Sequence, residues 1–547
     1  MMEKRTLIAI ALSIAVLLIW QFLVLGPQEA RRQAAQQERQ ARLEQEKLQA
    51  PAAEPKTEEP PPQAAAAEQA RGNAALRPPA AEAVPEETIR VATPLMDVLL
   101  SNRGGAVKQI TLKGYKADNG TPLVLAMPEP GGEFPLFLHT NVPDINKALN
   151  GSTYAVRGGD LALDDRRPEG TLTFTLDQAN GLRVEKRLTF HQNRYQIDVG
   201  VRVEGGALKG QGYEILWGPG LNAAAANDDE PKHGEPAVFL DGKLSSPQPA
   251  GAAWQERQGK ALWAGIQSKY FVAAMIPRSP VSAVVVRPAG EKRYSAGFEI
   301  DGRDLGVAKE FTLYAGPKEL QRLRAYDVKL ERVVDFGYFG FLGRPLQRVL
   351  AFFYRYSHNY GLAIIIITVL IKLAFYPLTN KSLASMKKMQ SLQPRIKELQ
   401  ERYKGDRQKI NQEMMGIYRQ QGASPISGCL PMALQIPVFI ALYNVLLTDI
   451  SLRHAPFLLW ITDLSKKDPY YITPIIMGAS MFLQQKMTPT TIDPTQAKMM
   501  LMMPVVFTFM FLNFPSGLVI YWLVNNILSI GQQLLVNRKL QESAPTT

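Results

Sequence analysis

The sequence predicts a polytopic α-helical membrane protein that carries a large antiparallel β-sandwich domain ahead of its membrane segments. Two observations support this fold class. Strongly apolar segments with at most one charged residue recur from residue 360 onward, and most approach the roughly 20 residues that a helix needs to cross a bilayer. Between Ile89 and Leu330, apolar and polar residues alternate instead, which is the period of a half-buried strand.

Composition narrows the class of function. The chain has 547 residues and a net charge of +12, and its basic residues gather beside the apolar segments. That placement indicates orientation signals and contact with anionic lipid rather than sequence-specific nucleic acid binding. The one cysteine, Cys429, excludes an intramolecular disulfide, and the five histidines lack metal-ligand spacing. We therefore expect no metal site and no cofactor.

The N-terminal segment, 1–27, is predicted to be an uncleaved transmembrane anchor. Its uncharged run exceeds the roughly 7–15 apolar residues of a signal peptide, which is the alternative. Lys4 and Arg5 place this end in the cytoplasm. Residues 28–85 are rich in Ala, Pro, Gln and Glu and are expected to form a disordered linker, a spacer rather than a binding segment.

Residues 86–332 are predicted to form the β domain, outside the cytoplasm. Alternating runs such as Thr171–Leu176 and Leu182–Phe190 are typical of strands, and Asn180–Gly181 between them indicates a hairpin. We expect two packed sheets. Arg103–Gly105 is interpreted as a turn between strands rather than an RNA-binding motif. The aromatic and basic segment 333–359 follows, and it favours a helix lying in the membrane interface over a packed helix of the β domain.

A membrane core is predicted over 360–540, followed by a short tail at 541–547. Lys381–Gly428 has ten Lys or Arg and four acidic residues, which places this loop and both termini in the cytoplasm. The anchor brings the total to six spans. The five later spans are expected at 360–380, 428–448, 470–486, 499–513 and 517–536.

Within the basic loop, 381–427 is predicted to form a hairpin of two short helices. Pro394 suits the first turn of one helix, Gly405 breaks the chain, and Asp406 could cap the next helix, which runs to Gln420. The hairpin is either a docking surface for a partner or substrate or a solvated charged loop, and composition does not separate the two.

Lys372 is the most informative single residue, because it is the only charged residue between His358 and Lys381. A charge at the centre of a spanning helix costs roughly 2.5–3.5 kcal/mol on insertion scales, so it usually faces a partner or a hydrated cavity. Thr368 shares its helix face. The later spans contain no acidic residue, so we expect Lys372 to attract negative charge on something that passes through. Other polar span residues could line the cavity or join helices by hydrogen bonds.

Several motifs resemble the YidC/Oxa/Alb family of membrane protein insertases, in its Gram-negative form. In the core, Tyr376-Pro-Leu-Thr379, Pro425-Ile-Ser-Gly-Cys-Leu-Pro431 and Phe514-Pro-Ser-Gly517 match. The β domain matches at Trp263 and Gly316-Pro-Lys318, and the combination covers nearly the whole chain. Further matches are Met386-Lys-Lys-Met389, Leu392-Gln-Pro394, Gln412-Glu-Met-Met415, Gln435-Ile-Pro437, Phe439-Ile-Ala-Leu-Tyr443, Asp468-Pro-Tyr-Tyr471 and Gln485-Lys-Met487.

The resemblance implies an insertase and membrane chaperone, not an enzyme, in the bacterial inner membrane, with a β domain in the periplasm that resembles a β-supersandwich. It implies a hydrophilic groove that carries a cation, which is usually arginine and is Lys372 here. It also implies as partners nascent membrane proteins, the Sec translocon and the ribosome, although so short a tail argues against tail-mediated ribosome binding. The residues that match groove or substrate-path positions are Lys372, Thr368, Gln435, Tyr521 and Trp522, and those of the cytoplasmic hairpin are Lys387, Lys388, Arg395 and Glu413.

Two other classes remain open from the residues alone. Six spans and an intramembrane cation permit a solute transporter, although no inverted repeat or pair of broken helices is evident. A periplasmic sugar enzyme is the other, since the β domain contains His139, His191 and His233, but none lies in a paired carboxylate motif.

Overall fold

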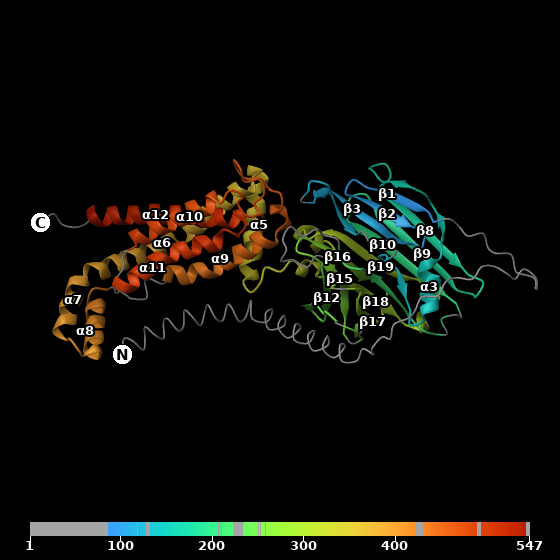
Figure 1. The fold of residues 1–547 in the computed structure, drawn as a ribbon, viewed down its shortest axis with the longest axis horizontal. Helices are drawn as coiled ribbons and strands as arrows, with labels where there is room; N and C mark the ends of the chain where they lie inside the picture. The colour runs from blue at the N-terminus through green and yellow to red at the C-terminus, as the bar shows by residue number, and fades with distance from the viewer. Residues whose placement is uncertain are drawn as a thin grey trace, which may run out of the picture. The chain divides into compact units, whose positions relative to one another are not determined.

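The computed structural model describes residues 86–542, apart from 118, 127–131, 206–207, 209, 222–233, 250, 252, 258, 291, 423–429 and 489–493. The predicted anchor, linker and last five residues lie outside this range. Two compact units contain the described chain. One includes Ser385–Ser427, and the other includes the β strands and the apolar helices that follow them (Figure 1).

Three sheets form the β domain. The first has the order β4-β3-β2-β1-β7 and is the smaller N-terminal meander. Every pair in it is antiparallel except β1 with β7, which run parallel. Its strands are β1 (Thr88–Ala92), β2 (Met96–Ser101), β3 (Ala106–Lys116), β4 (Pro122–Ala126) and β7 (Leu161–Ala162).

The second sheet has nine strands in the order β13-β12-β15-β16-β19-β10-β9-β8-β6. β8 and β9 alternate buried and exposed residues, whereas the central strand β16 is buried on both faces. These strands are β6 (Ala155–Arg157), β8 (Glu169–Asp177), β9 (Arg183–His191), β10 (Gln196–Glu204), β12 (Glu235–Leu240), β13 (Lys243–Ser245), β15 (Ala261–Gln267), β16 (Phe271–Pro277) and β19 (Lys309–Pro317).

The third sheet has the order β14-β17-β18-β11-β5, and its strands are also antiparallel. All five residues of β11 are buried, including Trp217, which is fully buried. The strands are β5 (Leu138–His139), β11 (Tyr213–Trp217), β14 (Trp254–Glu256), β17 (Ala283–Pro288) and β18 (Tyr294–Ile300).

The prediction of two sheets is therefore wrong, since the described residues form three. The alternation of apolar and polar residues shows only that one face of a strand is exposed to solvent. It does not identify the neighbouring strand in the sheet. The local predictions hold better. β8 pairs with β9 through a turn in which Gly181 has a φ of +80°, and Gly104 and Gly105 turn the chain between β2 and β3 with φ of +69° and +53°.

The helical segments follow the predicted apolar ranges closely. α6 continues eleven residues past the predicted span, through Pro377 and into the basic loop, because the residues after Asn380 are good helix formers. The helices are α3 (Pro143–Gly151), α4 (Leu320–Arg324), α5 (Gly340–Ser357), α6 (Tyr360–Ser391), α7 (Gln393–Arg402), α8 (Arg407–Gln420), α9 (Leu430–Thr448), α10 (Ile472–Met487), α11 (Pro494–Phe511) and α12 (Ser516–Glu542), with short 3-10 turns η3 (Gly302–Asp304), η4 (Leu330–Val333) and η6 (Ile450–Leu452).

Two of these helices, Tyr360–Ser391 and Ser516–Arg538, are long and apolar enough to cross a membrane by length and composition. Ala433–Thr448 and Met500–Phe511 are shorter apolar helices. The amphipathic α5 packs on α9: Gly343 approaches Val445, and the Gln347 amide donates to the buried carboxylate of Asp449 over 3.2 Å. Its exposed side chains include Phe341, Phe352 and Tyr356, and Tyr338 just before the helix is exposed as well.

Candidate functional site

The predicted cation, Lys372, lies on α6 and is partly buried. Its ammonium donates a hydrogen bond to the hydroxyl of Ser529 on α12, with 2.6 Å between Nζ and Oγ. Ser529 in turn donates to the main-chain carbonyl of Asn525, over 2.7 Å. The charge is thus held by a neutral hydroxyl, and within the part of the chain that the structure describes no acidic side chain forms an ion pair with the ammonium.

Polar residues on α12 recur at helical spacing and share one face. Tyr521, Asn525 and Ser529 are four residues apart, so they lie one above the other. Gln435 on α9 joins them, since its amide donates to Tyr521 Oη over 3.2 Å and to Asn525 Oδ1 over 3.1 Å. We call this connected set, Lys372, Gln435, Tyr521, Asn525 and Ser529, the polar stripe.

A second polar contact joins α6 and α12, one helical turn beyond Ser529. Gln532 of α12 donates to Asn380 Oδ1 of α6 over 2.7 Å. Gln532 is buried, so this contact also places polar atoms between helices. The polar stripe therefore continues toward the end of α6 that leads to the basic loop.

Two of the predicted residues stand apart from the polar stripe. Thr368 is buried, and its hydroxyl donates to Ile364 O of its own helix over 2.6 Å. Trp522 follows Tyr521 but contacts an aromatic cluster, with its ring centroid 4.8 Å from that of Phe439 and 5.1 Å from that of Phe511. Phe439 also stacks on Tyr521, so the aromatic cluster adjoins the polar stripe.

Sequence reasoning named Lys372, Gln435 and Tyr521 as site residues, and the structure brings these three into one network. It missed Ser529, and it gave Asn525 no specific role. A signal was present, because both lie at four-residue steps from Tyr521. Serine in a spanning segment is common, however, and the partner helix cannot be identified from spacing alone.

The predicted hairpin forms as α7 and α8 and has a small core of its own. Asp406 caps α8 by accepting from the amide of Lys409 over 3.0 Å, and Gly405 has a φ of +103° at the break. The apolar residues between the arms are Met389, Leu392, Ile396, Met414, Ile417 and Tyr418.

The four predicted hairpin residues differ in exposure. Lys387 and Lys388 lie in the last turns of α6, before the two hairpin helices, whereas Arg395 lies on α7 and Glu413 on α8. Lys388, Arg395 and Glu413 are exposed, and Lys387 is partly buried and makes a polar contact. The exposed side chains leave the hairpin with a charged outer surface. Among the described residues of the chain, no group of three or more His, Cys, Asp or Glu side chains is arranged to hold a metal ion.

A segment of 449–471 connects α9 to α10 and is tied to the ends of other helices. Its carbonyls at Lys466 and Leu464 accept from the amides of Ser516 and Gly517, over 2.7 and 3.0 Å. Its Phe457 carbonyl accepts from the Asn359 amide before α6, over 3.0 Å. The first amides of α12 are therefore satisfied by protein rather than by water.

These features define an integral membrane protein with a large β domain and a helical core that joins polar side chains across its apolar helices. Residues 88–349 match a family model described as the YidC periplasmic domain, and residues 352–543 match one described as the 60Kd inner membrane protein. The chain belongs to the YidC family of membrane protein insertases. It is therefore an inner-membrane insertase with a periplasmic β domain, of a family that is not enzymatic.

Full-length relatives support this assignment. The membrane protein insertase YidC of Syntrophus aciditrophicus (strain SB) is 41% identical over 98% of this chain and 100% of its own length. That of Geotalea uraniireducens (strain Rf4) is 39% identical over the same shares. A crystal structure of an active YidC insertase, with its first transmembrane domain resolved, aligns over 82% of this chain and 92% of its own at 18% identity and a TM-score of 0.35.

Proposed function

We propose that this insertase moves client segments through a hydrophilic groove lined by the polar stripe, and that Lys372 attracts acidic residues of the translocated tail. The observation that carries the proposal is the contact of Lys372 with a neutral hydroxyl in spans that contain no Asp or Glu. A carboxylate can replace Ser529 as the acceptor and form a stronger, charge-assisted hydrogen bond.

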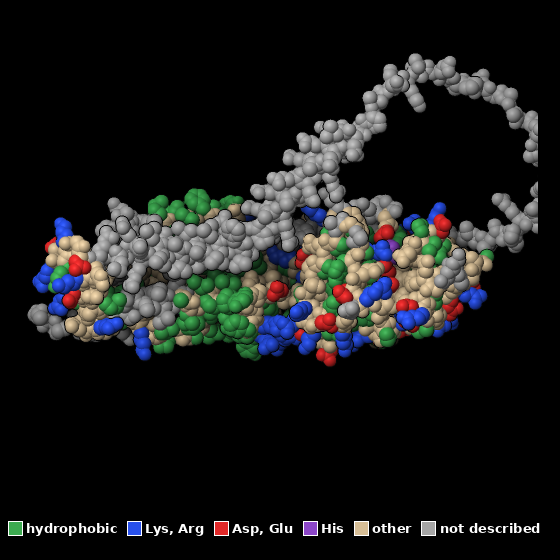
Figure 2. Space-filling model, turned by 90° about the horizontal axis from the view of Figure 1, so that it is seen from below, with side chains coloured by type: hydrophobic (Ala, Val, Ile, Leu, Met, Phe, Trp, Pro, Cys, Tyr) green, Lys and Arg blue, Asp and Glu red, His purple; other side chains and the backbone are tan. Residues whose placement is uncertain are grey.

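In this mechanism the apolar part of a client slides along lipid-facing side chains of the third and fifth later spans. Ile475 and Phe482 of α10 are exposed, as are Ile527 and Leu534 of α12, and apolar side chains gather over the helical part of the face in Figure 2. The polar tail enters the groove, where water reduces the thickness of the apolar layer that the tail must cross. The membrane potential assists the crossing. No covalent bond is made or broken.

The proposal includes the predicted topology of six spans with both termini in the cytoplasm. The hairpin then lies in the cytoplasm and presents Lys388, Arg395 and Glu413 to a partner, with Lys387 at its base. We propose that nascent chains, the ribosome and the Sec translocon are met on this side, that anionic lipid contacts the basic flanks, and that the protein also assists client folding as a chaperone.

The test uses purified full-length protein in liposomes with a single-span client whose short tail is acidic. Client protected from added protease is compared for wild type, Lys372→Ala and empty liposomes. Lys486→Ala is the matched control, because Lys486 is an exposed lysine in the last turn of α10, outside the polar stripe. We expect Lys372→Ala to lower protection at least fivefold and Lys486→Ala to leave it unchanged.

Replacing the acidic residues of the client tail by Asn and Gln should remove most of the difference between wild type and Lys372→Ala. Equal insertion of the acidic client by Lys372→Glu and wild type would refute the charge-attraction step. Insertion above empty liposomes by every variant would retain the insertase activity but remove Lys372 from its mechanism.

A further inference from the structure

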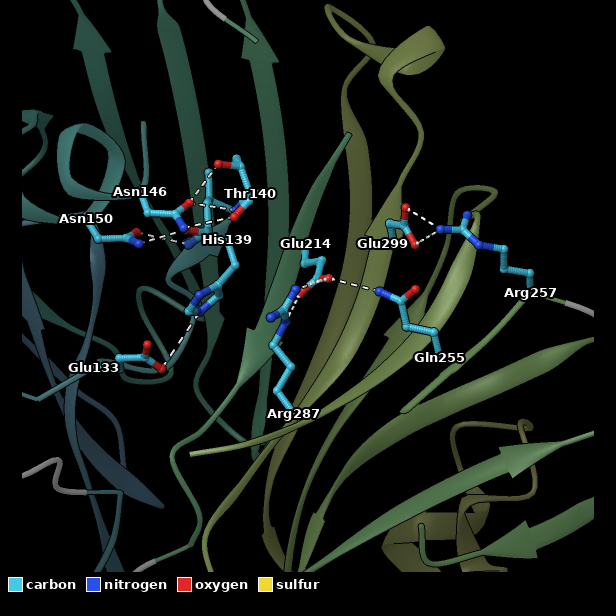
Figure 3. A network of polar contacts seen from close by, with 11 residues as sticks. Glu133, His139, Thr140, Asn146, Asn150, Glu214, Gln255, Arg257, Arg287 and Glu299 are labelled. Carbon is cyan, nitrogen blue, oxygen red and sulfur yellow. Dashed lines mark hydrogen bonds and ion pairs between the residues drawn. The ribbon is translucent and has the colours of Figure 1, made fainter. Parts of the chain in front are cut away.

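A cavity of about 500 Å³ lies in the β domain, far along the chain from the polar stripe. Strands β5, β11, β17 and β18 contribute to it, and Figure 3 shows the polar side chains around it. Its volume is within the roughly 300–1,000 Å³ typical of small-molecule sites. Polar lining residues are Glu133, His139, Arg287, Arg293 and Ser295, and apolar ones include Leu216, Pro219 and Pro288.

Two asparagines of α3 fix the main chain on both sides of His139. Asn150 donates to Leu138 O over 2.7 Å and accepts from Leu138 N over 3.0 Å. Asn146 does the same for Thr140, with 2.9 Å to its carbonyl and 2.6 Å from its amide. The residues on both sides of His139 are therefore fixed, and its ring faces Glu133, with 4.0 Å between Nε2 and the carboxylate (Figure 3).

A buried lysine fixes the same segment at a cost in stability. Lys186 is completely buried, and its Nζ donates to Leu136 O and to Gly104 O, each over 2.7 Å. Burying an ammonium is unfavourable even when it is hydrogen-bonded, whereas an apolar side chain could fill the space more cheaply. Expensive polar groups that position one short segment beside a cavity are typical of a binding site rather than of a plain core.

Arg287 is positioned by the carboxylate of Glu214, which is itself buried. Its Nε and Nη2 donate to Glu214 Oε2 and Oε1 over 2.5 and 2.7 Å, and Gln255 donates to the same carboxylate over 3.3 Å. This pair uses two of the five guanidinium N–H groups. The Glu214 carboxylate thus orients the Arg287 guanidinium at the cavity wall and pairs with its charge.

The charged side chains at the cavity are equal in number for each sign. Arg287 pairs with Glu214, and the lining adds Arg293 and Glu133, so the formal charges of these four residues sum to zero. Burial lowers the pKa of His139, and Arg287 and Lys186 add to this effect while Glu133 opposes it, so the neutral form of the imidazole is favoured. The cavity therefore offers hydrogen-bond donors and acceptors with no net charge, beside apolar surfaces from Leu216, Pro219 and Pro288.

We propose that this cavity binds a small, uncharged ligand rich in hydroxyl groups, such as a sugar. Hydroxyl groups both donate and accept, so they can pair with the Glu133 carboxylate, the His139 ring and the Arg287 guanidinium together. The C–H faces of such a ligand would lie on the proline and leucine side chains. An anion or a cation would find one partner and one repelling charge. This binding is independent of the insertion proposed above.

The experiment uses full-length protein in lipid nanodiscs free of glycoside detergents, with glucose as the probe and saturation-transfer NMR as the readout. Glucuronate, which differs from glucose by one carboxylate, tests the charge requirement. We expect saturable binding of glucose, and at least fivefold weaker binding of glucuronate.

The variants are Glu133→Gln and His139→Gln, which retain hydrogen-bonding capacity but alter the acceptors. Because a hydrogen bond to a charged group is involved, we expect Glu133→Gln to weaken glucose binding roughly tenfold. Glu169→Gln and His191→Gln are matched controls, since these two residues form a comparable pair on β8 and β9, with 3.0 Å between Nδ1 and Oε1, outside the cavity lining. The controls should bind like wild type.

Three results would overturn the proposal. The first is glucose binding that does not saturate. The second is equal loss of binding in the cavity variants and the controls, and the third is tighter binding of glucuronate than of glucose. Glu133 is exposed, so Glu133→Gln should fold even if His139→Gln does not, and the test then rests on the Glu133 and Glu169 pair of variants.

Discussion

Lys372 and Ser529 face one another from α6 and α12, and the 2.6 Å hydrogen bond between them is the central contact of the polar stripe. The arrangement differs from an ion pair, because a hydroxyl holds the ammonium without cancelling its charge. The contact is also reversible, since a stronger acceptor can displace the serine. The contact therefore fixes the position of the Lys372 ammonium and leaves its positive charge available to an acidic group of a client.

The Lys372–Ser529 contact can be measured by a double-mutant cycle on insertion of the acidic-tailed client. We expect Ser529→Ala to lower insertion two- to threefold, because the ammonium loses its fixed position, and Ser529→Thr to retain it. Once Lys372→Ala is present, adding Ser529→Ala should have no further effect. Additive losses in the double variant would show that Ser529 acts separately from Lys372.

Lys186 predicts how the stability of the β domain depends on pH. Burial lowers the pKa of Lys186 to about 7, whereas an unfolded lysine titrates near its ordinary value of 10.5. Between these values the folded state binds fewer protons than the unfolded state, so stability rises with pH. The unfavourable contribution of the buried ammonium is complete below pH 7 and is relieved as pH rises.

The matched variant is Lys186→Met, which keeps the length of the side chain without a titrating group. From pH 7 to 9, wild type should gain roughly 2 kcal/mol of stability relative to Lys186→Met. The temperature at which the β domain of the full-length protein loses resistance to protease gives the comparison. A difference between the two proteins that stays constant over this pH range would contradict the prediction.

The cap at Asp406 should control the start of α8. Asp406→Ala removes the acceptor for the Lys409 amide and should cost about 1 kcal/mol, whereas Asp406→Asn should cost little because asparagine caps equally well. Hydrogen exchange of the amides at 407–410 should be several-fold faster in the alanine variant. Equal exchange in the alanine and asparagine variants would argue against capping.

Two glycines in the helical core should respond differently to alanine. A Cβ at Gly478 of α10 would collide with the hydroxyl of Thr508 on α11, whereas a Cβ at Gly531 of α12 meets open space. We expect Gly478→Ala to destabilise the core by roughly 1–3 kcal/mol through overpacking. Gly531→Ala should be neutral or slightly stabilising, because alanine is the better helix former. Thermal melting of helical circular dichroism distinguishes the two, and similar midpoints would contradict close packing of α10 on α11.

The sequence predicted those features that depend on neighbouring residues. Asp406, Gly405 and Pro394 indicate the ends of α7 and α8 because caps and breaks act over one helical turn. The Asn180–Gly181 turn and the alternation around it predicted β8 and β9 for the same reason. Motif resemblance, rather than periodicity, supplied Gln435 and Tyr521.

Features that need distant residues were missed. Ser529 follows Lys372 by 157 residues, and no local pattern connects them. The cavity in the β domain likewise depends on Glu133, Arg287 and Ser295, which come from three separate segments. The number of sheets was wrong for a related reason, because the pairing partner of a strand is a long-range property.

The hydrogen bonds from Ser516 and Gly517 to the carbonyls of Lys466 and Leu464 have a further consequence. Because of these bonds, the amides of Ser516 and Gly517 at the start of α12 need no water as a hydrogen-bond acceptor. Under the proposed function, we expect water and the client tail to enter the polar stripe from the opposite end, near Gln532 and Asn380. The direction of insertion then follows from fixed main-chain hydrogen bonds. A client can enter from one side without a conformational gate on the other.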